Sequence, residues 1–437
     1  MKSISKLAPV ILQTIFGPLA TQLGRLTQFI RRQGKLDAAE FARTLCLFLI
    51  RYLKASLQQL SAELSITASA LSQRFQQPAT AEFLRQLLLR SLGELSLQRQ
   101  RPNLIPLLQR FNGVYPSDCT TIGLPDGLVR KFPGCGGGAK KDDQTAAVKV
   151  LLQINITTGQ STQLLIETGR TPDITMLNKL PPLPKGALEI ADLGSSTPSD
   201  SGPTTTGGVY WLTRLPARIS VCEKDKWKEL AVWLRGLKSK AIDHWEGELQ
   251  VSKSSPVSMR VLIQRCPPQE SARRRRKLHE RMKKKGKTAG WRQLVLCDWW
   301  VLATNIESEK LSLSEASDLY RTRWQIELVF KRWKSLGHVA VPSDLSAIHA
   351  ECELYARLLG VVVVDWLALL RGGPLSGRSV WQACQIVLEM LGAIIMALTG
   401  LILWKTVMQE LSNKLDRIPK QPNRKKRPST RQRLIKT

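Results

Sequence analysis

Acidic side chains are scarce in this sequence. Of its 437 residues, 35 are Asp or Glu and 65 are Lys or Arg, so the net charge at pH 7 is +30. With 43% hydrophobic and 23% charged residues, the chain is globular rather than disordered, and its length predicts two or three domains. The positive surplus indicates a polyanionic partner, which is either nucleic acid or an acidic membrane surface.

Zinc motifs and disulfide patterns are also missing. The eight cysteines are scattered without a C-x-x-C pair, and the four histidines are dispersed along the chain. This spacing excludes the common zinc sites and a disulfide framework. It fits a reducing compartment.

Long uninterrupted apolar runs are absent as well. The most apolar stretch, Ile386–Trp404, contains Glu389, and the run Leu358–Leu370 contains Asp365. Both fall short of the roughly 18 uninterrupted apolar residues that indicate a membrane span, so we predict buried core helices. An apolar patch at residues 7–19 is broken by two prolines, and we interpret it as structural rather than as a signal peptide.

The chain changes in texture along its length. Residues 1–110 have the three-to-four spacing of helices, and we predict a helical DNA-binding region there. Short apolar runs between turn residues predict strands in residues 111–215, and residues 216–310 alternate further strands with basic stretches. Helical periodicity returns over residues 311–411, and residues 412–437 form a basic tail.

Residues 60–75 have the rhythm of a helix-turn-helix. The turn falls at residues 65–66, and Thr67 can cap the second helix. Ser65 occupies a turn position that often requires glycine. An ordinary helical hairpin fits this pattern equally well, so both interpretations stay open.

One later segment combines an aromatic hydroxyl, three cations and a lone carboxylate. Five of its residues fall on one stripe of an ideal α-helix: Tyr320, Arg323, Glu327, Lys331 and Lys334. Such a stripe is the ordinary pattern of a salt-bridged surface helix. It is also the pattern of a metal ligand whose neighbours bind phosphates.

The spacing of four of these residues, Y-(2)-R-(3)-E-(6)-K, resembles the signature of bacterial insertion-sequence transposases of the insertion-sequence-four family. The resemblance covers roughly residues 55–435 and includes the segments Leu124–Gly127 and Phe132–Gly137. It implies an α/β fold, in which a ribonuclease-H-like catalytic core (111–215 and 311–411) is interrupted by a β-rich insertion (216–310). Helical N-terminal and C-terminal regions flank this core.

The resemblance also implies a catalytic Asp-Asp-Glu triad. Asp118 begins the run Asp-Cys-Thr-Thr-Ile, which is similar to the family's first aspartate strand, and Asp192 ends the run Leu-Glu-Ile-Ala-Asp, which is similar to the second. Glu327 supplies the third carboxylate. These three residues are expected to be both catalytic residues and metal ligands. The residues expected to bind DNA phosphates are Tyr320, Arg323, Lys331 and Lys334.

Phosphodiester chemistry explains why such a site needs carboxylates. Two Mg²⁺ ions, with Mn²⁺ as a substitute, align the nucleophile and stabilise the leaving oxygen, and these hard cations prefer oxygen ligands. The resemblance assigns Asp118 to both ions, Asp192 to one and Glu327 to the other.

The implied function is cut-and-paste transposition by a bacterial enzyme. Its expected partners are duplex DNA, as the element's terminal inverted repeats and the target, and a second copy of the chain in a homodimer. No membrane partner is expected, and the expected location is the cytoplasm, in association with the nucleoid. The basic runs at residues 273–285 and 424–433 are expected to follow the DNA backbone.

Three alternatives stay open. Residues 195–207, rich in Ser, Thr, Pro and Gly, stand where the family has an aromatic-bearing helix, so the chain is alternatively a decayed, inactive DNA-binding relative. The family's flipped base would stack on Trp299 or Trp300, although a strand tryptophan more often belongs to the core. A basic membrane-associated protein is the third interpretation, and it depends on Ile386–Trp404.

Overall fold

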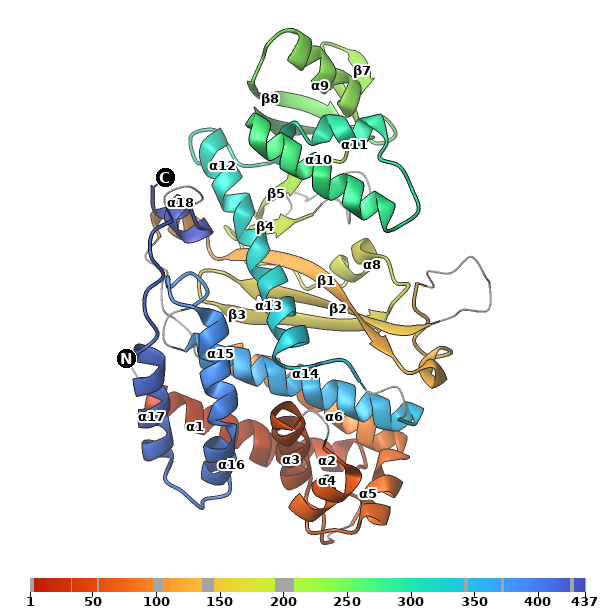
Figure 1. The fold of residues 1–437 in the computed structure, drawn as a ribbon, viewed down its shortest axis with the longest axis vertical. Coiled ribbons are helices and arrows are strands. Elements are labelled where there is room, and N and C mark those ends of the chain that lie inside the picture. The colour runs from red at the N-terminus through yellow and green to blue at the C-terminus, as the bar shows by residue number, and fades with distance from the viewer. Residues whose placement is uncertain are drawn as a thin grey trace. The chain divides into compact units, whose positions relative to one another are not determined.

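A computed structural model describes residues 4–32, 34–52, 55–96, 105–135, 145–192, 208–341, 345–370, 373–424 and 428–436. The polar patch at 195–207 lies outside the described residues. The chain forms two compact units (Figure 1). One, which we call the helical unit, comprises residues 1–103, 119–171 and 324–425, and the other, the sheet unit, comprises residues 104–118, 172–323 and 426–437.

Helices make up the N-terminal part of the helical unit. They are α1 (Ile4–Thr14), the π-helical turn η1 (Ile15–Leu19), α2 (Ala20–Leu26), α3 (Ala38–Arg51), α4 (Leu57–Glu63), α5 (Ala68–Phe75) and α6 (Pro78–Ser96). An aromatic cluster joins them: Phe29 stacks on Phe83 with ring centroids 4.8 Å apart, and Phe41 lies 4.8 Å from Phe29. The helical periodicity predicted for this region is therefore present and has a common core.

The predicted helix-turn-helix segment forms two helices, α4 and α5, joined by a short turn. The Thr67 hydroxyl accepts a hydrogen bond from the Ala70 backbone N–H at 3.2 Å and so caps α5. Ser65 lies in the turn with φ of 51°, in the left-handed region that favours glycine. Arg74 of α5 donates from Nη1 to the Phe29 carbonyl at 2.9 Å, so part of its guanidinium is bound within the helical unit.

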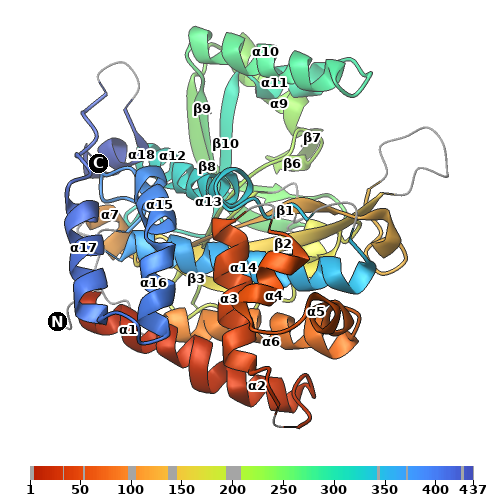
Figure 2. The same ribbon diagram turned by 60° about the horizontal axis from the view of Figure 1, so that its bottom comes forward.

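Five helices form the C-terminal part of the helical unit: α13 (Trp324–Ser335), α14 (Ala347–Leu369), α15 (Val380–Glu389), α16 (Leu391–Leu398) and α17 (Trp404–Asp416). α14 is buried along most of its length and packs against α3, α6 and α15 (Figure 1). α1 packs against α16 and α17, so the two ends of this unit's chain lie side by side (Figure 2).

The predictions for the two apolar runs differ in outcome. The run that contains Asp365 is a buried core helix, as predicted. The run Ile386–Trp404 is only partly buried, and Leu401 and Leu403 are 73% and 76% exposed. Among the described residues, one helical stretch, Lys6–Leu26, has the length and apolar composition of a membrane span, and half of its window is buried in the protein; α15 and α16 would qualify only as a pair bent by 53°.

The strands form a mixed arrangement. In the helical unit, β2 (Ala146–Asn155) and β3 (Gln160–Thr168) form an antiparallel hairpin beside the end of β1 (Val114–Leu124), whose first half belongs to the sheet unit. In the sheet unit the order is β1-β4-β5-β10-β9-β8-β6-β7. Its further strands are β4 (Leu188–Ala191), β5 (Tyr210–Arg214), β6 (Ser220–Glu223), β7 (Lys226–Glu229), β8 (His244–Val251), β9 (Val257–Arg265) and β10 (Trp299–Thr304). β1, β4 and β5 are parallel, and β5, β10, β9 and β8 are antiparallel. The predicted α/β class is therefore confirmed.

Short helices accompany the strands. Those of the sheet unit are α7 (Pro106–Gln109), α8 (Asp173–Leu177), α9 (Leu230–Ser239), α10 (Pro268–Lys283), α11 (Trp291–Leu296), α12 (Leu313–Tyr320), the 3₁₀ turn η3 (Arg321–Arg323) and α18 (Thr430–Lys436), and the 3₁₀ turn η2 (Asp126–Leu128) belongs to the helical unit. α18 lies within the segment expected to be a basic tail. It is anchored by buried Leu434 and by Arg433, which lies 3.3 Å from Asp318 of α12.

A buried ion pair ties α13 to α14. Arg332 Nε lies 2.7 Å from Asp365 Oδ1, and both side chains are less than 10% exposed. The Trp333 indole N–H donates to the other carboxylate oxygen at 2.6 Å, and the Cys384 thiol donates to Oδ1 at 3.3 Å. Burial lowers the pKa of Arg332, but the charge of Asp365, the interaction with Cys384 and the hydrogen bonds to both together outweigh it, so the net shift is upward. Both carboxylate oxygens of Asp365, the acid that interrupts this apolar run, thus have partners on neighbouring helices.

We expect Asp365→Asn to destabilise the protein by about 3–5 kcal/mol, because it leaves the Arg332 guanidinium buried without a counter-charge. Urea unfolding followed by circular dichroism measures the shift in midpoint. The control is Glu410→Gln in the exposed Glu410–Lys414 pair, for which we expect about 0–1 kcal/mol. An equal shift in both variants would contradict the buried pair.

We expect Ser65→Gly to stabilise the protein by up to about 1 kcal/mol, because glycine adopts the left-handed conformation without strain. Ser69→Gly is the matched control, since Ser69 is also exposed but lies inside α5, where glycine costs about 0.5 kcal/mol relative to serine. Thermal unfolding of both variants should give shifts of opposite sign. Destabilisation by Ser65→Gly would show that the turn is not strained.

Candidate active site

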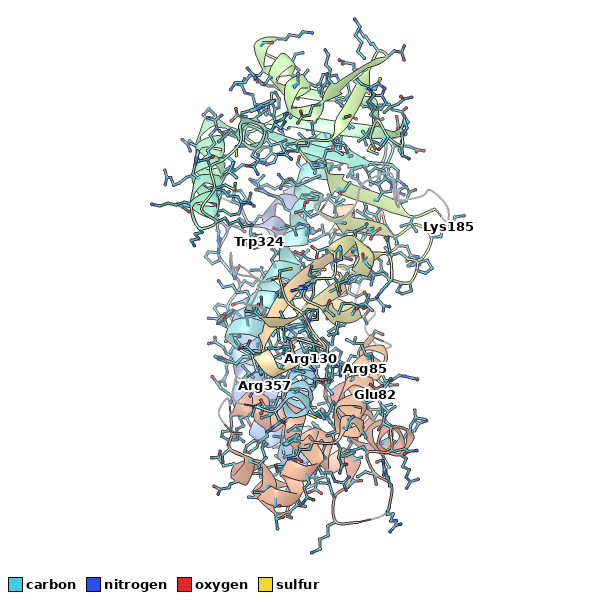
Figure 3. All side chains as sticks on the ribbon, turned by 90° about the vertical axis from the view of Figure 1, so that its right-hand side faces the viewer. Glu82, Arg85, Arg130, Lys185, Trp324 and Arg357 are labelled. Atoms are coloured by element: carbon cyan, nitrogen blue, oxygen red, sulfur yellow. The ribbon has the colours of Figure 1, made fainter. Side chains whose placement is uncertain are left out.

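The segment that carries the Tyr-Arg-Glu-Lys spacing is not one continuous α-helix. α12 ends at Tyr320, the 3₁₀ turn covers Arg321–Arg323, and α13 begins at Trp324. A 3₁₀ turn winds more tightly than an α-helix, so the stripe predicted for one continuous helix is interrupted before α13. Glu327, Lys331 and Lys334 lie on α13 at spacings of four and three residues and keep a common face. The apolar residues of α13 are nonetheless buried as expected, whereas the Trp324 side chain is 55% exposed (Figure 3).

Asp118 lies on β1, and Asp192 directly follows the last residue of the neighbouring parallel strand β4. β1 pairs with β4 in the register Val114↔Leu188 and Pro116↔Ile190, an offset of 188 − 114 = 74 residues. The two aspartates have the same offset, 192 − 118 = 74. Parallel strands present their carboxyl ends at one edge of a sheet. The strands therefore bring both acids to the same place.

Arg323 bridges these two carboxylates. Its Nη1 donates to Asp118 Oδ2 at 2.8 Å, and its Nη2 lies 3.7 Å from Asp192 Oδ2. The Arg323 side chain is 16% exposed, and those of Asp118 and Asp192 are 26% and 44% exposed. A single cationic group thus occupies the position between two acids that would otherwise repel each other.

Tyr320 stands beside this cluster. Its hydroxyl is buried beside Asp192, Arg323 and Arg214. Burial raises the pKa of Tyr320 well above 10, the Asp192 charge raises it further, and the charges of Arg323 and Arg214 lower it. The hydroxyl therefore keeps its proton and can donate to an anion.

The remaining predicted residues lie on α13, in the helical unit. Glu327 is half-buried in the first turn of α13. Lys334 donates from Nζ to the Thr121 carbonyl at 3.0 Å, and partial burial lowers the pKa of Lys334. Lys331 is exposed, with its Nζ 6.0 Å from the centre of the Trp381 ring. The structure thus brings Asp118, Asp192, Tyr320 and Arg323 together in the sheet unit, whereas Glu327 and the two lysines belong to the helical unit.

Two aspartates are a suitable beginning of a cation site. Their carboxylate oxygens are the donors that hard divalent ions prefer, and the Arg323 guanidinium shows that a positive group fits between them. No group of three or more His, Cys, Asp or Glu suited to a metal occurs within the described part of the chain. The observed donor set is therefore a pair of carboxylates.

The two tryptophans considered for base stacking differ in burial. Trp299 is 1% exposed and belongs to the core of the sheet unit with Trp211 and Trp233, so the core interpretation holds for it. Trp300 is half-buried, and its role in stacking stays a prediction.

Sequence reasoning did not single out two residues near this cluster. Arg214 is the last residue of β5, and Glu189 lies on β4, where burial raises the pKa of its carboxyl. A lone charge in an otherwise apolar strand is the signal that would have found both.

Comparison with known proteins adds independent support. The family described as transposase DDE domain matches residues 116–360. The transposase for insertion sequence element IS231C from Bacillus thuringiensis subsp. berliner is 26% identical over 371 residues, which cover 79% of this chain and 75% of that protein. The transposase for insertion sequence element IS1151 from Clostridium perfringens is 25% identical over 366 residues, 78% of this chain and 76% of the relative.

A shorter similarity has a higher identity. The putative transposase InsL for insertion sequence element IS186A from Escherichia coli (strain K12) is 29% identical over 111 residues, 25% of this chain and 30% of the relative. The family match contains Asp118, Asp192 and Glu327 and spans more than half of the chain. The protein therefore belongs to the DDE transposases, which are DNA-cleaving enzymes.

Proposed function

We propose that this protein is the transposase of an insertion sequence and that it cuts and joins the ends of that element by cut-and-paste, two-metal phosphoryl transfer. The observation that carries the proposal is the bridge that Arg323 forms between Asp118, on β1, and Asp192, at the end of the parallel strand β4. The relatives named above support the substrate, since their names refer to insertion sequence elements.

The DDE family depends on divalent metal. In this proposal the ions are Mg²⁺, with Mn²⁺ as a substitute, and Asp118, Asp192 and Glu327 hold them. When bound, the ions activate the attacking oxygen and stabilise the leaving oxygen. The remaining steps belong to the side chains of the protein.

Arg323 has two roles in this proposal. Without metal its guanidinium offsets the charges of Asp118 and Asp192. With metal bound to the aspartates, the guanidinium would be available to bind a DNA phosphate, for which its planar set of donors is suited. The protonated hydroxyl of Tyr320 donates to the same phosphate region, and Lys331 and Lys334 bind neighbouring phosphates.

The domain organisation follows the same proposal. The parallel strands β1, β4 and β5 belong to a ribonuclease-H-like core of residues 111–215 and 311–411, and residues 216–310 are the β-rich insertion. Residues 1–110, with the helix-turn-helix segment α4–α5, and the basic residues 412–437 bind DNA outside the active site. The enzyme acts as a homodimer on inverted repeats and target DNA, in the bacterial cytoplasm at the nucleoid.

A second candidate is an inactive relative that still binds element ends. The Ser-, Thr-, Pro- and Gly-rich sequence at residues 195–207 favours it, because this segment follows Asp192 directly. Both candidates predict binding of DNA, and only the first predicts cleavage.

We expect Asp118→Asn, Asp192→Asn and Glu327→Gln each to reduce cleavage of an end-containing duplex to the level without protein, because each removes a charged oxygen ligand. DNA binding should remain. Cleavage in Mg²⁺, followed on a denaturing gel, measures the first effect, and a mobility shift without metal measures the second. The control is Asp126→Asn, an exposed acid in η2.

Cleavage by the three variants at the wild-type rate would contradict the catalytic assignment. Binding by the wild-type protein without any cleavage would select the inactive relative instead.

We expect Arg323→Ala to strengthen the binding of Mn²⁺, because it removes the cation that competes for the two aspartates. Thermal unfolding at increasing Mn²⁺ concentration measures this, since a ligand that binds only the folded state raises the melting temperature. Arg321→Ala is the matched control, an exposed arginine in the same turn. Asp118→Asn should abolish the Mn²⁺ response, and an unchanged response in Arg323→Ala would refute the competition.

A further inference from the structure

A cationic pocket opens in the sheet unit between α10, α11 and the end of β5. Four of its lining residues are cations: Arg214, Arg274, Lys277 and Arg281. The apolar part of its wall consists of Leu278, Leu296 and Cys297. None of the described residues that line it is acidic. Its volume of about 360 Å³ far exceeds the roughly 10–15 Å³ that a single water needs, so a group larger than a simple ion fits.

The basic run of α10 divides into two faces. Arg274, Lys277 and Arg281 follow one another at spacings of three and four residues, so they share one face of the helix. On an ideal helix Arg276 and Lys283 point roughly 180–200° away from Arg274. Only the first face lines the pocket.

Some cations of the basic run in α10 are paired with acids, and others are not. Arg273 and Arg275 are held by Glu270 and Asp298 at 2.6 and 2.5 Å. Arg274 is fixed in place because its Nη1 donates to the Cys266 sulfur and to the Trp299 carbonyl at 2.7 and 2.8 Å. Its charge therefore has no acidic partner in these contacts.

Lys277 and Arg281 are exposed, and neither forms an ion pair or a hydrogen bond with any other described residue. The nearby acid Asp298 already contacts Arg275 and Lys238. The pocket thus combines one anchored guanidinium with two cations that are available to an anion.

Arg214 connects the pocket to the candidate active site. β4 pairs with β5 in the register Ala191↔Thr213, an offset of 22 residues, and Asp192 and Arg214 have the same offset. Continuing this register by one residue aligns Arg214 with Asp192, which directly follows β4. Its charge also acts on the Tyr320 hydroxyl. An anion bound in the pocket would therefore lie beside Arg214, the residue aligned with Asp192.

We propose that this pocket binds the phosphate backbone of a DNA strand next to the active site, with Lys277, Arg281 and Arg214 contacting the phosphate and the apolar wall contacting the sugar. The proposal deepens the proposed function and rests on it in taking the anion to be DNA. It assigns a DNA contact to one face of α10 and excludes the opposite face, which has the same charge.

The test compares two double variants of α10 that remove the same charge. Lys277→Gln with Arg281→Gln removes two pocket cations, and Arg276→Gln with Lys283→Gln removes two cations from the opposite face. Fluorescence anisotropy of a labelled duplex of mixed sequence is measured without divalent metal over a series of KCl concentrations. For the pocket variant we expect weaker binding of DNA. The slope of log K against log salt should fall in magnitude by about 1–2, because fewer counterions are released from the DNA when two phosphate contacts are lost. The opposite-face variant should keep the wild-type slope.

Several results would overturn the proposal. Equal losses in the two variants would mean that only the total charge matters, and unchanged binding in the pocket variant would mean that the pocket does not contact DNA. Sedimentation with phosphatidylserine vesicles is run in parallel, and a loss confined to vesicle binding would assign the pocket to lipid phosphates instead. Far-ultraviolet circular dichroism confirms that both variants fold. Because no metal is present, a failure of the catalytic assignment leaves this result unaffected.

Discussion

Two like charges held on adjacent strands need a cation between them. The pairing of β1 with β4 brings Asp118 and Asp192 close together, so their carboxylates repel each other unless a positive group offsets the charges. In the protein alone, Arg323 supplies the positive charge. The acid pair explains why the 3₁₀ turn at residues 321–323 matters, since this turn carries Arg323, whose guanidinium reaches both carboxylates.

The same row of strands also orders the charges around the site. Asp118 on β1, Asp192 directly after β4 and Arg214 at the end of β5 follow in line when the registers of these parallel strands are continued, so two negative charges are followed by one positive charge. The cationic pocket of α10 continues from Arg214. A phosphate that approaches this edge is repelled by the bare acids and attracted by the pocket. Its favourable position is therefore beside the acids, where a metal ion or Arg323 then neutralises the remaining repulsion.

Much of this could be predicted from the sequence, because local patterns decide it. The run that ends at Asp192 was expected to be a strand, and β4 forms there, while Thr67 caps α5 as its position before the helix suggested. The offset of 74 residues between the aspartates was visible, but its meaning required the strand pairing. The 3₁₀ turn was not predictable from periodicity, because three residues of tighter winding leave almost no signal in an apolar pattern. The bridge from Arg323 to both aspartates depends on contacts between residues about 130 and 205 positions apart, which no local rule supplies.

The cations that make up the net charge of +30 fall into two groups, those paired with acids of the protein and those without such partners. Arg332 is buried against Asp365 and stabilises the helical unit, whereas Arg273 and Arg275 are neutralised by acids on their own unit. These cations are structural and contribute little to the binding of an external polyanion. Lys277 and Arg281 lack such partners among the described residues and therefore remain attractive to phosphate. A cation adds to the affinity for DNA when it contacts a phosphate and so displaces a counterion from the DNA. DNA affinity therefore depends on how many unpaired cations lie beside the acid pair, and not on the total net charge.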